Sequence, residues 1–166
     1  MSRRAEVLAD RCDTAIQAVI DLIASTSPDA LNRTCEAEGW TAAAVGAHIA
    51  VSQDFLIDRV RRIVEDEQFP PFDAAAFHGG NARAAELNAD LSAGQLIALL
   101  RDHGARATEY VRGLSDVDLD RSRSIPAMGE NPTTAEQFSE RILIGHTEAH
   151  LQSLLPCLSN PDPVPG

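Results

Sequence analysis

Aromatic residues are scarce in this sequence, making up 4% of its 166 residues, although 44% of the chain is hydrophobic. The core must therefore be built mainly from leucine, isoleucine, valine and alanine, a mixture that suits helices better than sheets. No segment alternates apolar and polar residues over a useful length, as a half-buried strand would. The length predicts one domain, which buries roughly 68–70% of the surface that the unfolded chain exposes.

Positive charge is also in short supply, because the formal net charge is −11. A negative field repels phosphate backbones, so we expect no nucleic-acid partner. No uncharged apolar run reaches the ~18 residues of a membrane span. The basic start at Arg3 and Arg4 lacks the apolar stretch of a signal peptide. We therefore predict a cytoplasmic protein with no membrane partner.

Cysteine is represented by Cys12, Cys35 and Cys157, an odd number without C-x-x-C spacing. This pattern indicates reduced thiols rather than a disulfide framework, and it offers no cysteine-ligated zinc site. The sequence also lacks a G-x-S-x-G nucleophile motif, a phosphate-binding loop and a dinucleotide fingerprint. Any chemistry must therefore come from other residues.

Four stretches of helical periodicity dominate what the chain does contain. They run from about Arg3 to Ala24, from Thr41 to a solvated end that begins at Glu65, from Ser92 to Gly113, and from Thr133 or Thr134 to about Cys157. Thr41 is a good N-cap, while Ser92 with Gln95 and Thr133 with Glu136 have capping-box spacing. Four helices of roughly 20 residues predict an all-α four-helix bundle. We assign it to residues 1–158, with a flexible tail at 159–166.

The connections between these helices contain most of the proline and glycine signals. We predict a loop over residues 69–80, which contains two adjacent prolines near its start and ends in His78-Gly79-Gly80, and a short helical piece over 82–87. Residues 116–132 are polar and contain two prolines and a glycine, so we predict a long connection there.

The most informative stretch is Gly145-His146-Thr147-Glu148-Ala149-His150, inside an apolar run from Phe138 to Leu155. In a helix, residues four apart stack on one face, so His146 and His150 can bind the same metal ion. The alternative is two core histidines, each satisfied by a hydrogen bond. Two such residues on one buried row would double the desolvation cost with no evident structural return. Glu148 is two residues from each histidine and faces away from them, so it does not match the general base of an H-E-x-x-H helix.

A catalytic zinc-type site needs a third protein ligand and an open position. His48, inside the second helix, is the best candidate because a bundle can bring that helix against the fourth. His103 is the main rival, although we favour a core or groove histidine there, and His78 is predicted to be a loop residue. Three imidazoles suit zinc, nickel, iron or copper, and spacing alone does not choose among them.

Two of these segments resemble signatures of the DinB/YfiT-like superfamily. Gly39 to Ala50 has the spacing W-[ST]-x-x-x-[apolar]-x-x-His, and the H-x-x-x-H of the fourth helix resembles the second signature. The resemblance covers nearly the whole chain and includes mycothiol-dependent maleylpyruvate isomerase N-terminal domains. It implies an up-down-down-up bundle, often dimeric, with a divalent metal held by His48, His146 and His150. The isomerase branch usually has glutamate at the position of His146, which argues against the isomerase reaction itself.

These observations leave three functional hypotheses. The leading one is a transferase in which a divalent metal, zinc or nickel first and iron next, activates a low-molecular-weight thiol that attacks a small electrophile. The second is a metal-assisted hydrolase, in which water is the nucleophile. The third is a non-enzymatic dimer that binds metal or a small ligand in a stress response. The apolar fourth helix also predicts a homodimer.

Overall fold

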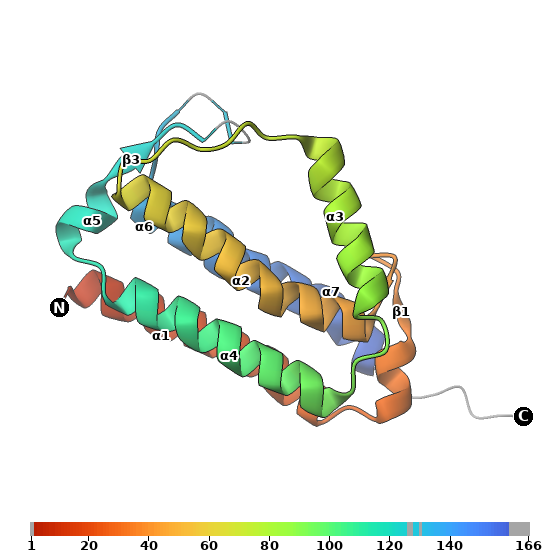
Figure 1. The fold of residues 1–166 in the computed structure, drawn as a ribbon. Coiled ribbons are helices and arrows are strands. Elements are labelled where there is room, and N and C mark those ends of the chain that lie inside the picture. The colour runs from red at the N-terminus through yellow and green to blue at the C-terminus, as the bar shows by residue number, and fades with distance from the viewer. Residues whose placement is uncertain (1, 126–127, 130, 160–166) are drawn as a thin grey trace, which may run out of the picture.

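The computed structural model of the protein describes residues 2–125, 128–129 and 131–159, and it is predominantly helical (Figure 1). The long helices are α1 (Arg3–Ala24), α2 (Ala42–Val64), α4 (Ala93–Arg112) and a final helix made of α6 (Ala135–Phe138), the π-helical segment η2 (Ser139–Ile144) and α7 (Gly145–Ser159). Shorter helices are η1 (Pro28–Asn32), α3 (Ala74–Leu87) and α5 (Asp116–Asp120). The strands are β1 (Thr34–Cys35), β2 (Trp40–Thr41), β3 (Ser122–Arg123) and β4 (Thr133–Thr134). The predicted all-α bundle is confirmed.

Consecutive helices in this bundle are not all neighbours. The helix α1 packs mainly against α4 and the final helix, and α2 packs against the same two helices, so that α1 and α2 lie at opposite corners. Followed by colour in Figure 1, α1 and the final helix run in one direction while α2 and α4 run in the other. This is the up-down-down-up arrangement that the resemblance implies. Its consequence is that α2, which carries His48, packs against α7, which carries His146 and His150.

The predicted helix starts agree with the observed caps. Thr41 begins α2, and its hydroxyl accepts a hydrogen bond from the backbone N–H of Ala44 at 3.2 Å. The same hydroxyl donates to the Ala89 carbonyl at 3.1 Å, which ties the beginning of the α3–α4 connection to the start of α2. Ser92 and Gln95 form the predicted capping box of α4. These caps satisfy backbone N–H groups that would otherwise lack partners in the first turn.

The buried core consists of two mainly aliphatic clusters, one in each half of the bundle. A polar pair lies between them, where the amide of Gln53 donates to the Thr147 hydroxyl at 3.0 Å and to the Ile49 carbonyl at 3.2 Å. Both Gln53 and Thr147 are buried. Because Gln53 belongs to α2 and Thr147 to α7, this pair joins the two helices next to His146.

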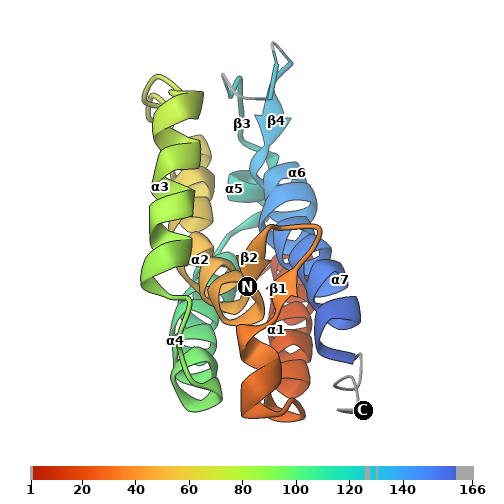
Figure 2. The same cartoon turned by 90° about the vertical axis from the view of Figure 1, so that its right-hand side faces the viewer.

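Two predictions about the connections are wrong in part. The predicted loop over residues 69–80 ends at Asp73, because α3 begins at Ala74 and the Asp73 side chain caps it by accepting from the Ala76 N–H at 3.0 Å. The alanine-rich sequence and packing against α2 outweigh the helix-weakening effect of Gly79 and Gly80. Figure 2 shows α3 outside the bundle, alongside α2. The predicted irregular connection over 116–132 contains α5, which a Ser115 cap begins.

The final helix begins as predicted at Thr134, but its capping box pairs Thr134 with Gln137 and not Thr133 with Glu136. The Glu136 carboxylate instead binds Arg4 of α1 at 2.6 Å. The helix continues to Ser159, so the first residue of the predicted tail is helical, while residues 160–166 lie outside the described part of the chain.

The four strands form two antiparallel pairs, β1 with β2 and β3 with β4. In the first pair Thr34 lies opposite Thr41 and Cys35 opposite Trp40. Strands of two residues are too short to produce an alternating pattern, which is why the sequence does not reveal them. Within the described ranges, no helix combines the length and the apolar character needed to cross a membrane.

Candidate metal centre

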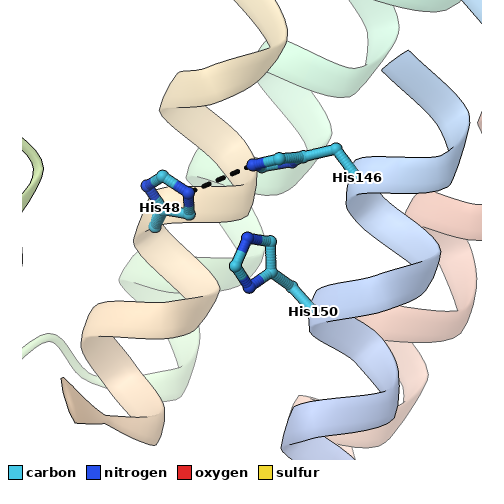
Figure 3. Close-up of side chains that lie close together, drawn as sticks. All are labelled: His48, His146 and His150. Atoms are coloured by element: carbon cyan, nitrogen blue, oxygen red, sulfur yellow. Dashed lines mark hydrogen bonds between the residues drawn. The ribbon is translucent and has the colours of Figure 1, made fainter. Parts of the chain in front are cut away.

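The three histidines predicted to form a metal site lie together in the structure. His48 on α2 faces His146 and His150 on α7 (Figure 3), and one nitrogen from each ring lies within 4.8 Å of the others. The Nε2 atoms of His48 and His146 are 3.1 Å apart. The ring centroids are 5.0 Å apart for His48 and His146, 4.8 Å for His48 and His150, and 4.5 Å for His146 and His150. The three rings therefore converge on one point between two helices that are antiparallel neighbours.

The position of His48 follows from the start of α2. The Thr41 cap sets the first turn, and His48 lies about two turns further along the helix. Small buried residues at Ala44 and Ala47 allow the helix to pack closely here. Trp40, just before the helix, packs its ring edge to face with His48 at a centroid distance of 5.4 Å. This tryptophan contact restricts the orientation of the imidazole.

The π-helical segment η2 ends immediately before Gly145 and His146. Such segments are rare and occur mostly as single wide turns, frequently at functional sites. A wide turn rotates less per residue than an α-helical one, and Phe138, Ile142 and His146 accordingly line the same pocket. These three residues, four apart in sequence, therefore lie on one side of the final helix, and η2 helps to direct them there.

Burial keeps two of the three imidazoles, those of His48 and His146, in the form that binds metals. Burial lowers the pKa of His48 to about 4, helped by the nearby His150. Burial also lowers the pKa of His146 to about 3, with further contributions from His150 and His48. Both rings are therefore neutral near pH 7, and a neutral imidazole has a lone pair available for a metal ion.

Glu38 is a site residue that the sequence analysis missed. Its carboxylate Oε1 lies 2.8 Å from Nδ1 of His150, and the two side chains are only 15% and 17% exposed. An acceptor at Nδ1 holds the proton on that nitrogen and leaves Nε2 free for a metal. Glu38 comes from the turn between β1 and β2, where the N–H groups of Glu38 and Gly39 both donate to the Cys35 carbonyl at 3.0 and 2.8 Å.

Gly39 makes that turn possible, because its φ of +72° lies in the region that favours glycine. A glycine directly after a glutamate and before the Trp-Thr helix start is a local signal for a tight turn. Its relation to His150, 112 residues away, exists only in the folded chain. The carboxylate therefore belongs to the site through tertiary structure alone.

The residues present fit a divalent metal. Two imidazole nitrogens bound tetrahedrally to zinc at ~2.0–2.1 Å would be about 3.3–3.4 Å apart, close to the 3.1 Å between the Nε2 atoms of His48 and His146. Three imidazoles with a carboxylate behind one of them match the usual composition of such sites. Nδ1 of His146 is buried and has no hydrogen-bond partner among the described residues. An imidazole that binds a metal through Nε2 carries its proton on Nδ1.

The other candidates lie elsewhere. Nδ1 of His103 on α4 is 2.9 Å from the Asp54 carboxylate and 2.8 Å from the Arg106 guanidinium, so it belongs to a surface ion-pair cluster. His78 is exposed on α3, and Glu148 is exposed on α7. This is the placement that the offset of Glu148 from the two histidines predicts.

Two pockets adjoin the histidines, and both include His146 in their lining. The first, which we call the α3 pocket, has a volume of about 300 Å³ between α2 and α3 and is also lined by His48, Ser52, Asn81 and Gly80. The second, which we call the phenylalanine pocket, has a volume of about 290 Å³. Phe55, Leu56, Phe77 and His146 line both. The candidate metal centre is therefore reached from two directions.

Comparison with known families agrees with the geometry of the site. The sequence from residue 11 to residue 154 matches the model of the DinB superfamily. The chain belongs to the DinB superfamily. A search of curated proteins finds no significant match.

Among solved structures, this DinB-superfamily chain is similar to YfiT from Bacillus subtilis. The match has a TM-score of 0.72 and 18% sequence identity, and it covers 95% of this chain and 87% of that chain. YfiT is described as a probable metal-dependent hydrolase with an unusual four-helix bundle topology. At this level of identity the likeness establishes the shared fold.

Proposed function

We propose that this DinB-superfamily protein is a metal-dependent transferase that joins a low-molecular-weight thiol, of the mycothiol type, to an electrophilic small molecule. The observation that carries this proposal is the pair of pockets, similar in volume, that meet at His146. A transferase must hold two reactants in reach of one centre, and holding both in a defined geometry is itself a large part of catalysis.

The roles of the residues follow from their contacts. His48, His146 and His150 would hold the metal, for which zinc, nickel and iron are all suited by imidazole ligands. When bound, such an ion lowers the pKa of a thiol or a water molecule that reaches it. Glu38 holds the proton of His150 on Nδ1. In the α3 pocket, Ser52 and Asn81 supply the polar groups that a thiol carrying peptide or sugar groups requires.

The transfer forms one carbon–sulfur bond. The thiol releases its proton to solvent, and an electron pair of the sulfur attacks the electrophilic carbon. Either a leaving group departs with its bonding electrons, or the electrons of an activated double bond shift and take up a proton. No oxidant or reductant is consumed, so the thiol and the electrophile are the only reactants that the transfer needs.

A metal-assisted hydrolase is the second candidate, favoured by the description of YfiT as a probable metal-dependent hydrolase. In that case water replaces the thiol, and one of the pockets has no second reactant to hold. The presence of both pockets is the reason that we rank the transferase first.

Elemental analysis tests the metal centre. We expect about one divalent ion per chain, and a strong loss of metal in His48→Ala, His146→Ala and His150→Ala. His103→Ala and His78→Ala are matched controls, because these histidines lie outside the group. Full metal content in His48→Ala would contradict the assignment.

Cobalt substitution tests the thiol. Mycothiol, bacillithiol, glutathione and cysteine would each be added to the cobalt form, and the correct thiol should produce a sulfur-to-metal charge-transfer band. The same thiol should be consumed with an electrophile only when all three histidines are intact. If no thiol changes the spectrum and none is consumed, the transferase is excluded, and ester or amide hydrolysis by the metal form would support the hydrolase.

A further inference from the structure

All five phenylalanines of the chain line the phenylalanine pocket. They come from α2, from the segment before α3, from α3 itself and from α6, and they are Phe55, Phe69, Phe72, Phe77 and Phe138. Among the described residues, Phe138 is the only aromatic residue that is fully part of the buried core, which is otherwise aliphatic. Phe55, Phe72 and Phe77 remain 40%, 49% and 36% exposed. Burial in the core therefore does not account for the gathering of phenylalanines at this place.

The rings form an aromatic wall. The centroid of Phe77 is 5.9 Å from that of Phe55 and 5.5 Å from that of Phe72, within the range in which aromatic rings attract one another. The guanidinium of Arg59 lies 4.0 Å above the Phe55 ring. It pairs with Asp58 at 2.9 Å, a carboxylate that Arg61 and Arg62 also contact, and those two arginines pair in turn with Glu65 and Glu67. Three carboxylates therefore balance the three arginines, and the wall adds no net charge to the pocket. Such a surface favours an apolar ligand and disfavours a charged one.

The pocket is continuous with the candidate metal centre, because His146 is part of its lining. Its volume of about 290 Å³ is roughly twice the ~150 Å³ of an apolar cavity that holds benzene. An occupant with one or two fused rings would therefore fill it while placing one end beside the histidines. A closed subunit interface would not require a concave surface that ends at a histidine.

We infer that the phenylalanine pocket binds the electrophilic substrate through a flat, uncharged aromatic group of one or two rings. The reacting carbon of that substrate would lie at the His146 end. This inference rests on the proposed function for the reaction, but the binding of the aromatic group depends only on the pocket. The α3 pocket remains for the thiol.

Direct binding of 2-naphthol, a neutral two-ring probe, tests the inference without any reaction. Its affinity would be measured by fluorescence titration and calorimetry on the metal-loaded and the metal-free protein. We expect Phe77→Ala to weaken binding about five- to tenfold, since one aromatic contact and its buried area are lost. Phe77→Leu, which keeps apolar volume, is a second variant that preserves the packing of α3 and should weaken binding less. Leu87→Ala is the matched control, because Leu87 is on the same helix, is 73% exposed and is not part of the lining.

The outcomes separate this inference from the proposed function. Failure of the unmodified protein to bind 2-naphthol, or equal binding by Phe77→Ala, would overturn the inference whatever the thiol experiments show. It would also be overturned if Phe77→Ala converted a dimer that excludes the probe into a monomer, because the wall would then be a subunit interface. Specific binding that Phe77→Ala weakens, with metal content unchanged, supports the pocket even if no thiol alters the cobalt spectrum. In that case only the transfer reaction would be lost.

Discussion

Removing the carboxylate of Glu38 should weaken metal binding without removing any metal ligand. The carboxylate lies 2.8 Å from Nδ1 of His150 and both side chains are largely buried, so no bulk water competes freely for the contact. Loss of a carboxylate that orients a metal-binding histidine typically lowers metal affinity about 10- to 100-fold. This corresponds to about 1.4–2.7 kcal/mol of binding free energy. We expect Glu38→Ala to fall in this range.

Glu38→Gln divides the effect into two parts. Its amide oxygen can still accept the proton of His150 Nδ1, so the tautomer is kept while the negative charge is lost. We expect an affinity between those of the unmodified protein and Glu38→Ala. Glu36→Ala is the matched control, because Glu36 is in the same turn between β1 and β2 and is exposed.

Metal affinity would be measured by competition with a chromophoric chelator at fixed pH, with circular dichroism confirming that each variant is folded. If Glu38→Ala binds metal as tightly as the unmodified protein and Glu36→Ala, then Glu38 does not position His150 for a metal. The role that we assign to the β1–β2 turn would then be refuted, while the histidine group itself would stand.

Three further predictions concern the fold. Gly104→Ala places a Cβ 2.8 Å from Cγ2 of Ile16, which is too close for two carbon atoms. Such overpacking lowers the free energy of unfolding by about 1–3 kcal/mol, and the better helix propensity of alanine restores about 1 kcal/mol of it. The midpoint of urea unfolding should therefore fall. The metal-free protein should lose stability as the pH falls from about 6.5 towards 4. The pKa values of His48 and His146 are lowered in the folded protein, so in this pH range the unfolded chain binds more protons than the folded one. The free energy of unfolding should fall by at most about 1.4 kcal/mol per pH unit for each imidazole. Urea unfolding at about pH 7.5 and about pH 5 should show this loss, and an unchanged midpoint would contradict the burial of the two rings. The homodimer stays a prediction, for which light scattering at high micromolar concentration is the measurement, and a monomer there would rule it out.

The bundle was largely predictable because its signals are local. The helical periodicity from Arg3 to Ala24, the Thr41 cap and the Ser92–Gln95 box each depend on residues within a few turns of one another, and all three agree with the structure. The two connections that were assigned wrongly in part combine a local cause, the helix cap, with a tertiary one. At α3, packing against α2 and the Asp73 cap outweigh the weak helix propensity of Gly79 and Gly80.

The pairing of His146 with His150 was likewise contained in the sequence, because the i, i+4 spacing in any helix places both rings on one face. The sequence also contained the spacing from Trp40 to His48 that links the chain to its superfamily. What the tertiary structure alone decided is which distant residues join them. The crossing of α2 with α7 brings in His48, the β1–β2 turn brings in Glu38, and the position of α3 gathers five phenylalanines beside His146. Such contacts depend on how helices pack over long separations in the chain, and neither periodicity nor capping carries that information.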